Sequence, residues 1–129
     1  MANTLTEQQI ETMAIEIRNF LLAHRLWIDV AIYFNGKAFS TSDGNRRFTY
    51  NDPDDLIVLE DQDPTRITGY AGDILTMTFE GPLYDCMNFT GELGHDYESK
   101  IESWLSNIFL KYGCYYELCE AWSLTLCKI

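Results

Sequence analysis

An Asn-Gly pair at positions 35 and 36 is the feature that most restricts how this chain can fold. It directly follows residues 27–34, a run of β-branched and aromatic side chains that reads WIDVAIYF. A two-residue type I′ turn requires a positive φ at both positions, and Asn-Gly is a strongly preferred pair for it. The sequence therefore predicts an antiparallel hairpin in which Lys37–Thr41 returns beside residues 27–34.

Further strands are predicted from alternation and from turn residues. Arg46–Tyr50 follows a Ser-Asp-Gly-Asn turn and is expected to form the third strand of a meander. Ile74–Phe79 alternates strictly and predicts another strand, and Tyr115–Cys127 predicts one long final strand. Leu56–Leu59 is a short apolar run that fits either a buried strand or a helical turn. Residues 82–95 carry no regular period and are expected to be irregular.

Two segments have the period of amphipathic helices. In residues 6–25 apolar side chains recur every three or four positions, and Thr6 with Gln9 makes a capping box at the start. A second helix is expected at 96–112, with Asp96 as its N-cap. Together with the strands, these helices predict an α+β fold, in which two amphipathic helices pack on a mostly antiparallel sheet of about five strands. Residues 1–129 are expected to form a single compact domain.

The charge balance restricts the partners of this fold. Twenty acidic residues stand against nine basic ones, which gives a net charge of −11, while 47% of the chain is hydrophobic. The composition predicts a packed domain with a strongly negative surface, not a disordered acidic tail. A net charge of magnitude about 2 to 8 suffices for solubility in a small domain. We therefore expect attraction to basic protein surfaces and no direct binding to nucleic acid, whose phosphates are repelled.

The sequence has no recognisable export or membrane signal. Residues 1–13 lack the basic and apolar regions of a signal peptide, and the apolar stretch 26–34 is interrupted by Asp29 and too short to span a bilayer. A cytoplasmic location without membrane association is therefore the expectation. In that reducing compartment the four cysteines should be free thiols.

The densest group of acids lies between residues 51 and 64, where six carboxylates occur without a basic residue. Duplex DNA presents one negative charge per about 1.7 Å of axis, so a protein that imitates it needs carboxylates in rows on a rigid scaffold. We predict that this segment is such a DNA mimic, although solvated loop charges would give the same pattern. The predicted partner-binding residues, with two tyrosines as rim anchors, are Asp52, Asp54, Asp55, Glu60, Asp61, Asp63, Tyr50 and Tyr70.

Cysteine and histidine residues point to a zinc site as an alternative interpretation. Zinc sites usually contain paired short spacings such as C-x₂-C, and the sequence has none. His95, Cys114 and Cys119 would approach one another only if the helix ends fold back. A zinc-stabilised adaptor that uses these three ligands is the alternative to the DNA mimic, and otherwise no cofactor is expected.

Catalytic motifs are missing from the sequence. There is no G-x-S-x-G, no phosphate-cradling glycine loop and no H-E-x-x-H. A Ser-His or Cys-His site needs no fixed spacing, so a small enzyme that acts on a cationic substrate stays open as a third interpretation. The sequence favours a protein that is not an enzyme.

The stretch Trp27–Thr41, which reads WIDVAIYFNGKAFST, looks like segments of uncharacterised proteins from bacterial mobile elements. Small size, an acidic surface and the lack of enzyme motifs also resemble the anti-CRISPR and antirestriction proteins of phages and mobile elements. The resemblance implies a non-enzymatic inhibitor in the bacterial cytosol that binds the basic nucleic-acid channel of a Cas effector or a restriction enzyme. Such inhibitors share no fold, so no binding residues are carried over.

Overall fold

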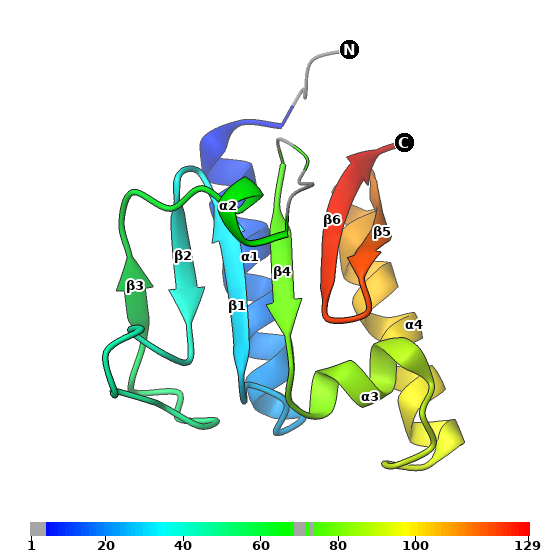
Figure 1. Ribbon diagram of the computed structural model, residues 1–129. Coiled ribbons are helices and arrows are strands. Elements are labelled where there is room, and N and C mark those ends of the chain that lie inside the picture. Colours follow the sequence, from blue (N-terminus) through cyan, green and yellow to red (C-terminus); the bar gives the residue numbers. More distant parts are fainter. Residues whose placement is uncertain (1–4, 69–71, 73) are drawn as a thin grey trace.

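The computed structural model describes residues 5–68, 72 and 74–129. Within these residues, six strands form one antiparallel sheet in the order β3-β2-β1-β4-β6-β5 (Figure 1). The strands are β1 Val30–Phe34, β2 Lys37–Ser40, β3 Ile57–Leu59, β4 Thr76–Phe79, β5 Cys114–Glu120 and β6 Ser123–Lys128. The helices are α1 Glu7–Ala23, α2 Thr65–Thr68, α3 Pro82–Asn88 and α4 His95–Lys111. The predicted α+β class is confirmed, with six strands where about five were expected.

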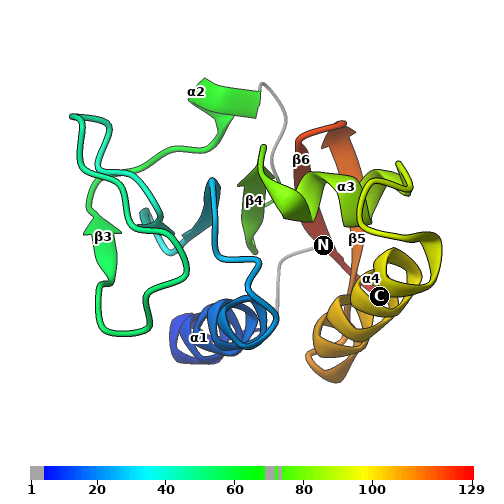
Figure 2. The same ribbon diagram turned by 90° about the horizontal axis from the view of Figure 1, so that it is seen from below.

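The two long helices cover the same face of the sheet. Figure 2 shows α1 and α4 side by side below the strands, while α2 lies on the opposite side. α1 contacts β1 and α4 contacts β5, so each helix covers a different half of the sheet. The short helix α3 connects β4 to α4 (Figure 1). The face of the sheet that points away from α1 and α4 is called the open face below.

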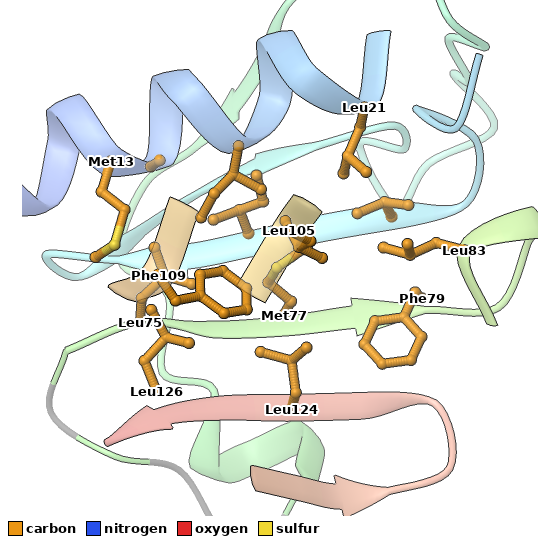
Figure 3. Close-up of a cluster of buried hydrophobic side chains, with 14 of the residues drawn as sticks. Met13, Leu21, Leu75, Met77, Phe79, Leu83, Leu105, Phe109, Leu124 and Leu126 are labelled. Atoms are coloured by element: carbon orange, nitrogen blue, oxygen red, sulfur yellow. The ribbon is translucent and has the colours of Figure 1, made fainter. Parts of the chain in front are cut away.

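The core lies between these helices and the sheet. Figure 3 shows side chains from α1, α3, α4, β4 and β6 pointing toward one another in this layer. Strand alternation explains the set, because Met77 and Leu124 are register partners and therefore share the face that meets the helices. The core side chains labelled in Figure 3 are at most 1% exposed: Met13, Leu21, Leu75, Met77, Phe79, Leu83, Leu105, Phe109, Leu124 and Leu126.

The strongest local signals of the sequence are confirmed. Asn35 and Gly36 have φ values of 50° and 77°, and the register places Phe34 opposite Lys37 across this two-residue turn. Thr6 and Gln9 form the predicted capping box at the start of α1. The first strand begins at Val30 and not at residue 27, because Asp29 has a φ of 55° and bends the chain before the ladder starts.

Two predicted strands are wrong. Arg46–Tyr50 is no strand and contributes only an isolated bridge between Phe48 and Ser42, so β3 takes the third place in the meander. The long final strand 115–127 is instead the hairpin of β5 and β6, with Ala121 and Trp122 between the two strands. This turn lacks glycine and asparagine, which explains why the sequence did not indicate it.

The segment before α4 also differs from the prediction. Residues 82–95 contain α3, and Pro82 is its first residue, a position that suits proline because no intrahelical N–H is needed there. The predicted N-cap Asp96 lies inside α4, whose N-cap is Gly94 and has no side-chain capping bond. Gly69 and Gly72 also predict a turn from the sequence, and Gly69 lies outside the described residues.

We predict that Phe109→Ala lowers the free energy of unfolding by about 3–5 kcal/mol, because it leaves a cavity among fully buried neighbours. The matched control is Leu110→Ala on the same helix, whose side chain is 51% exposed and should cost about 0.5 kcal/mol or less. Urea unfolding followed by circular dichroism measures both. Equal losses for the two variants would contradict the assigned core.

Candidate protein-binding surface

The acidic segment lies at a free edge of the sheet. β3 pairs with β2 on one side, with Ala38 opposite Leu59 and Ser40 opposite Ile57. Its other side pairs with no strand in the described part of the chain (Figure 1). Because an edge strand presents unpaired N–H and C=O groups, it is a ready place for another chain to bind.

Most side chains from Phe48 to Glu60 are exposed, while Thr49 and Ile57 between them are buried. We call seven of these exposed residues the acidic edge: Phe48, Tyr50, Asp52, Asp54, Leu56, Val58 and Glu60. Large apolar side chains stand among its carboxylates, with Phe48 56%, Tyr50 54%, Leu56 42% and Val58 41% exposed. The acidic edge thus combines apolar contact area with negative charge, and exposed apolar patches rimmed by polar residues mark interaction sites.

The two aromatic rings of the acidic edge contact each other. The centroids of Phe48 and Tyr50 lie 6.1 Å apart, with 24° between the ring planes. Two stacked rings restrict each other's rotamers, so less side-chain entropy is lost when a partner covers them. Tyr50 was predicted as a rim anchor and its exposure agrees with that role. Tyr70, the other predicted anchor, lies outside the described residues.

Asn51 fixes the position of the acidic edge. Its Oδ1 accepts a hydrogen bond from the backbone N–H of Trp27 at 3.2 Å, and its Nδ2 donates to the carbonyl of Leu22 at 3.2 Å. Its own backbone N–H donates to the carbonyl of Trp27 at 2.8 Å. The φ of Asn51 is 53°, in the left-handed region that Asn tolerates better than most residues. The segment is therefore attached to the loop between α1 and β1.

The six predicted carboxylates do not form one continuous row. Three precede β3 and three follow it, and the Cα atoms of Asp55 and Glu60 are separated by about 16 Å of extended chain. In the first group Asp55 forms an ion pair with Arg47. Arg18 donates to the carbonyl of Asp52 at 3.4 Å, and burial lowers the pKa of its guanidinium while the charges of Asp52 and Asp55 raise it. This group is thus partly neutralised by arginines.

The second group is less neutralised. Asp63 accepts hydrogen bonds from the hydroxyl of Thr65 at 2.6 Å and from its N–H at 3.0 Å, and these bonds lower the pKa of the Asp63 carboxyl. Arg66 lies 4.0 Å from Asp63. Glu60 and Asp61 form no ion pair with the described residues. The carboxylates that face solvent without an internal cation are therefore Asp54, Glu60 and Asp61.

The ligands of the zinc alternative are not brought together. His95 begins α4 and Cys114 begins β5, so the 17 residues of α4 separate them by about 25 Å. Across the described residues, no group of three or more His, Cys, Asp or Glu is placed to hold a metal ion. Burial, with the charges of Glu98 and Asp85, raises the pKa of Cys86 to about 11, so that thiol stays protonated at neutral pH. Cys119 is partly exposed and lies in β5.

A buried carboxylate that sequence reasoning missed is Glu98. It is 0% exposed and accepts hydrogen bonds from the backbone N–H groups of Gly91 at 2.9 Å and Leu93 at 3.0 Å. Burial alone would raise its pKa, but the N–H groups of Leu93 and Gly91, together with His95 and Thr90, hold it below the ordinary 4.5. Because both oxygens are held by the α3–α4 connection, we interpret Glu98 as a structural residue.

Comparison with known proteins identifies no relative: no family model, no curated protein and no solved structure matches the chain. Within the described residues, none of the helices combines the length and the apolar composition that crossing a membrane requires.

We predict that Asn51→Ala lowers the free energy of unfolding by about 2–3 kcal/mol, because it removes two side-chain hydrogen bonds and puts alanine at a positive φ. Asn45→Ala is the control, because Asn45 is exposed and its side chain makes no hydrogen bond within the described chain; it should change stability by about 0.5 kcal/mol at most. Urea unfolding monitored by tryptophan fluorescence measures both. If Asn51→Ala is as stable as the control, Asn51 does not attach the acidic edge to the loop between α1 and β1.

We predict that Glu98→Gln lowers the melting temperature by several degrees at neutral pH, because an amide cannot accept from all of these donors. A carboxyl whose folded pKa is depressed stabilises the fold above its unfolded value and loses this contribution as the pH falls through the folded value. The difference in melting temperature between the native chain and Glu98→Gln should therefore become smaller below about pH 4.5. Thermal melts between pH 3 and 7 measure this difference. A difference in melting temperature that is independent of pH would contradict an ionised Glu98 in the folded protein.

Proposed function

We propose that this protein is a non-enzymatic inhibitor that docks on the basic nucleic-acid channel of a bacterial defence nuclease, a Cas effector or a restriction enzyme, and blocks access of DNA. The observation that carries the proposal is the acidic edge, where exposed carboxylates lie among exposed apolar side chains beside a free sheet edge. The net charge of −11 extends the attraction for a cationic surface beyond direct contacts.

The proposed contacts differ in strength. Asp54, Glu60 and Asp61 meet a basic partner without first breaking an internal ion pair. Asp52, Asp55 and Asp63 contribute less, because Arg18, Arg47 and Arg66 already lie beside them. Leu56 and Val58 supply apolar area between the two acidic groups, and the Phe48–Tyr50 pair supplies aromatic anchors. The inhibitor is therefore a mixed polar and apolar binder more than a pure charge mimic.

The proposed place of action is the bacterial cytosol, where these nucleases meet foreign DNA. Four cysteines without a disulfide are in keeping with a reducing compartment. Direct binding to nucleic acid is not part of the proposal, because the chain and DNA carry the same sign of charge.

The test measures DNA binding and cleavage by a panel of purified Cas effectors and restriction enzymes in the presence of the protein. We expect inhibition of at least one of them, weakened by added salt because the attraction is electrostatic. The double variant Asp54→Lys with Glu60→Lys should raise the half-inhibitory concentration by about 100-fold, at about 1.4 kcal/mol per tenfold change. The control Glu92→Lys with Glu120→Lys changes the net charge equally at exposed sites outside the acidic edge and should stay within about threefold.

Two results would overturn the proposal in different ways. Equal inhibition by the acidic-edge variant and the native chain would refute the acidic edge as the binding site, but not the inhibitory activity. Failure of the folded protein to inhibit every nuclease of the panel, and to restore phage growth in bacteria that carry those nucleases, would remove the activity itself.

A further inference from the structure

The open face of the sheet contains a recess of about 400 Å³ at the ends of β1 and β4. Its lining comes from six separate parts of the chain and includes Asp29, Phe48, Ile67, Thr78, Glu80 and Trp122. The buried residues Val30, Ala31 and Tyr33 also line it, whereas the core side chains labelled in Figure 3 are not part of its lining. Its volume lies within the range of about 300–1,000 Å³ that is typical of small-ligand sites.

Two carboxylates stand together at this recess. The backbone N–H of Glu80 donates to the carbonyl of Asp29 at 3.0 Å, which places the two residues side by side where β1 begins and β4 ends. Strand alternation puts Glu80 on the same face as Thr78, opposite to the core residue Phe79. Both acids are exposed, and neither forms an ion pair within the part of the chain that the structure describes.

Aromatic side chains line the recess as well. Phe48 is 56% exposed, Trp122 is half-buried, and Tyr33 is buried with its hydroxyl against Thr78. Faces of aromatic rings attract cations, most strongly where water is partly excluded. A recess that joins two unpaired carboxylates to aromatic rings is therefore complementary to an organic cation that has a flat apolar surface.

We propose that this recess binds an arginine side chain of a basic protein partner. A guanidinium is planar, stacks on aromatic rings and donates in a fixed fork to carboxylates, whereas the ammonium of lysine is a compact, strongly hydrated charge. Charge complementarity selects this occupant, since the recess presents Asp29 and Glu80 in a chain of net charge −11. Phe48 belongs both to the recess and to the acidic edge, so one partner covers both surfaces. The inference rests on the proposed function in that the arginine comes from the same nuclease.

The first experiment tests the recess without the nuclease. ¹H–¹⁵N NMR spectra of the full chain are recorded during titration with N-acetyl-arginine methylamide, and with the lysine and citrulline analogues. We expect saturable shifts of Thr78, Glu80 and the Trp122 indole with the arginine probe. We expect several-fold weaker binding of the lysine probe and no saturable shifts with citrulline, which has the shape of arginine without its charge.

Matched variants separate the recess from overall charge. Asp29→Asn with Glu80→Gln should weaken binding of the arginine probe at least tenfold. Asparagine keeps the positive φ of 55° at position 29 without added strain. The control Glu92→Gln with Glu120→Gln has the same net charge and should bind the probe as the native chain does. Equal affinities of the two double variants, or an equal response to citrulline, would overturn the inference.

The second experiment measures nuclease inhibition by the same variants. Asp29→Asn with Glu80→Gln should weaken inhibition at least tenfold if the arginine belongs to the nuclease. Loss of inhibition in Asp54→Lys with Glu60→Lys, but full inhibition by Asp29→Asn with Glu80→Gln, would overturn the inference and leave the proposed function standing. Binding of the arginine probe in the recess, without inhibition of any nuclease, would instead overturn the proposed function and the assignment of the partner.

Discussion

The contact between Trp27 and Asn51 is the constraint on which the candidate surface depends. Trp27 is fully buried, and its backbone N–H and carbonyl are both bonded to Asn51. The guanidinium of Arg18 lies 5.6 Å from the centre of the Trp27 ring and also donates to the carbonyl of Asp52. One buried residue thus joins the end of α1, the approach to β1 and the start of the acidic edge. The position of the exposed carboxylates is therefore determined by the core.

Negative charge at a sheet edge has a structural role besides partner binding. Charged side chains on edge strands prevent two sheets from pairing edge to edge, and β5 at the other edge also carries exposed acids, Glu117 and Glu120. Protection alone does not explain the β3 edge, however, because Leu56 and Val58 add apolar surface there. Exposed aliphatic side chains favour edge pairing and so work against protection. Their presence between acids fits an edge that admits basic partners and repels a second copy of the chain.

Local signals predicted the elements that depend on neighbouring residues alone. The capping box at Thr6 and the turn at Asn35 and Gly36 need only a few residues, and both were predictable. The β5–β6 hairpin was not, because its Ala-Trp turn has no residue with a turn preference. The α3 helix was missed because residues 82–95 show no regular period, although Pro82 suits a first helical position.

The candidate site was predictable only in its composition. The sequence shows a dense group of acids, but one arginine beside it comes from a distant position: Arg18 lies in α1 and is brought to Asp52 by the fold. Glu98 is one of two acids in the first turn of α4, and only the path of residues 90–93 makes it a buried acceptor. The recess likewise combines residues from positions 29, 48, 80 and 122. Contacts of this kind have no periodicity, so no pattern in one sequence reveals them.

The acidic edge and the recess would act on different steps of binding. Carboxylates that have no internal ion pair attract a basic surface over roughly a Debye length, about 8 Å at physiological salt. This attraction mainly raises the association rate. A side chain held between carboxylates and aromatic rings is desolvated, and its loss mainly raises the dissociation rate. Attraction alone would let the protein slide over any cationic surface, because charge at this range has no fixed orientation. A single arginine in the recess would fix the orientation of the partner. Because Phe48 belongs both to the recess and to the acidic edge, the same orientation would also align the partner with the acidic edge.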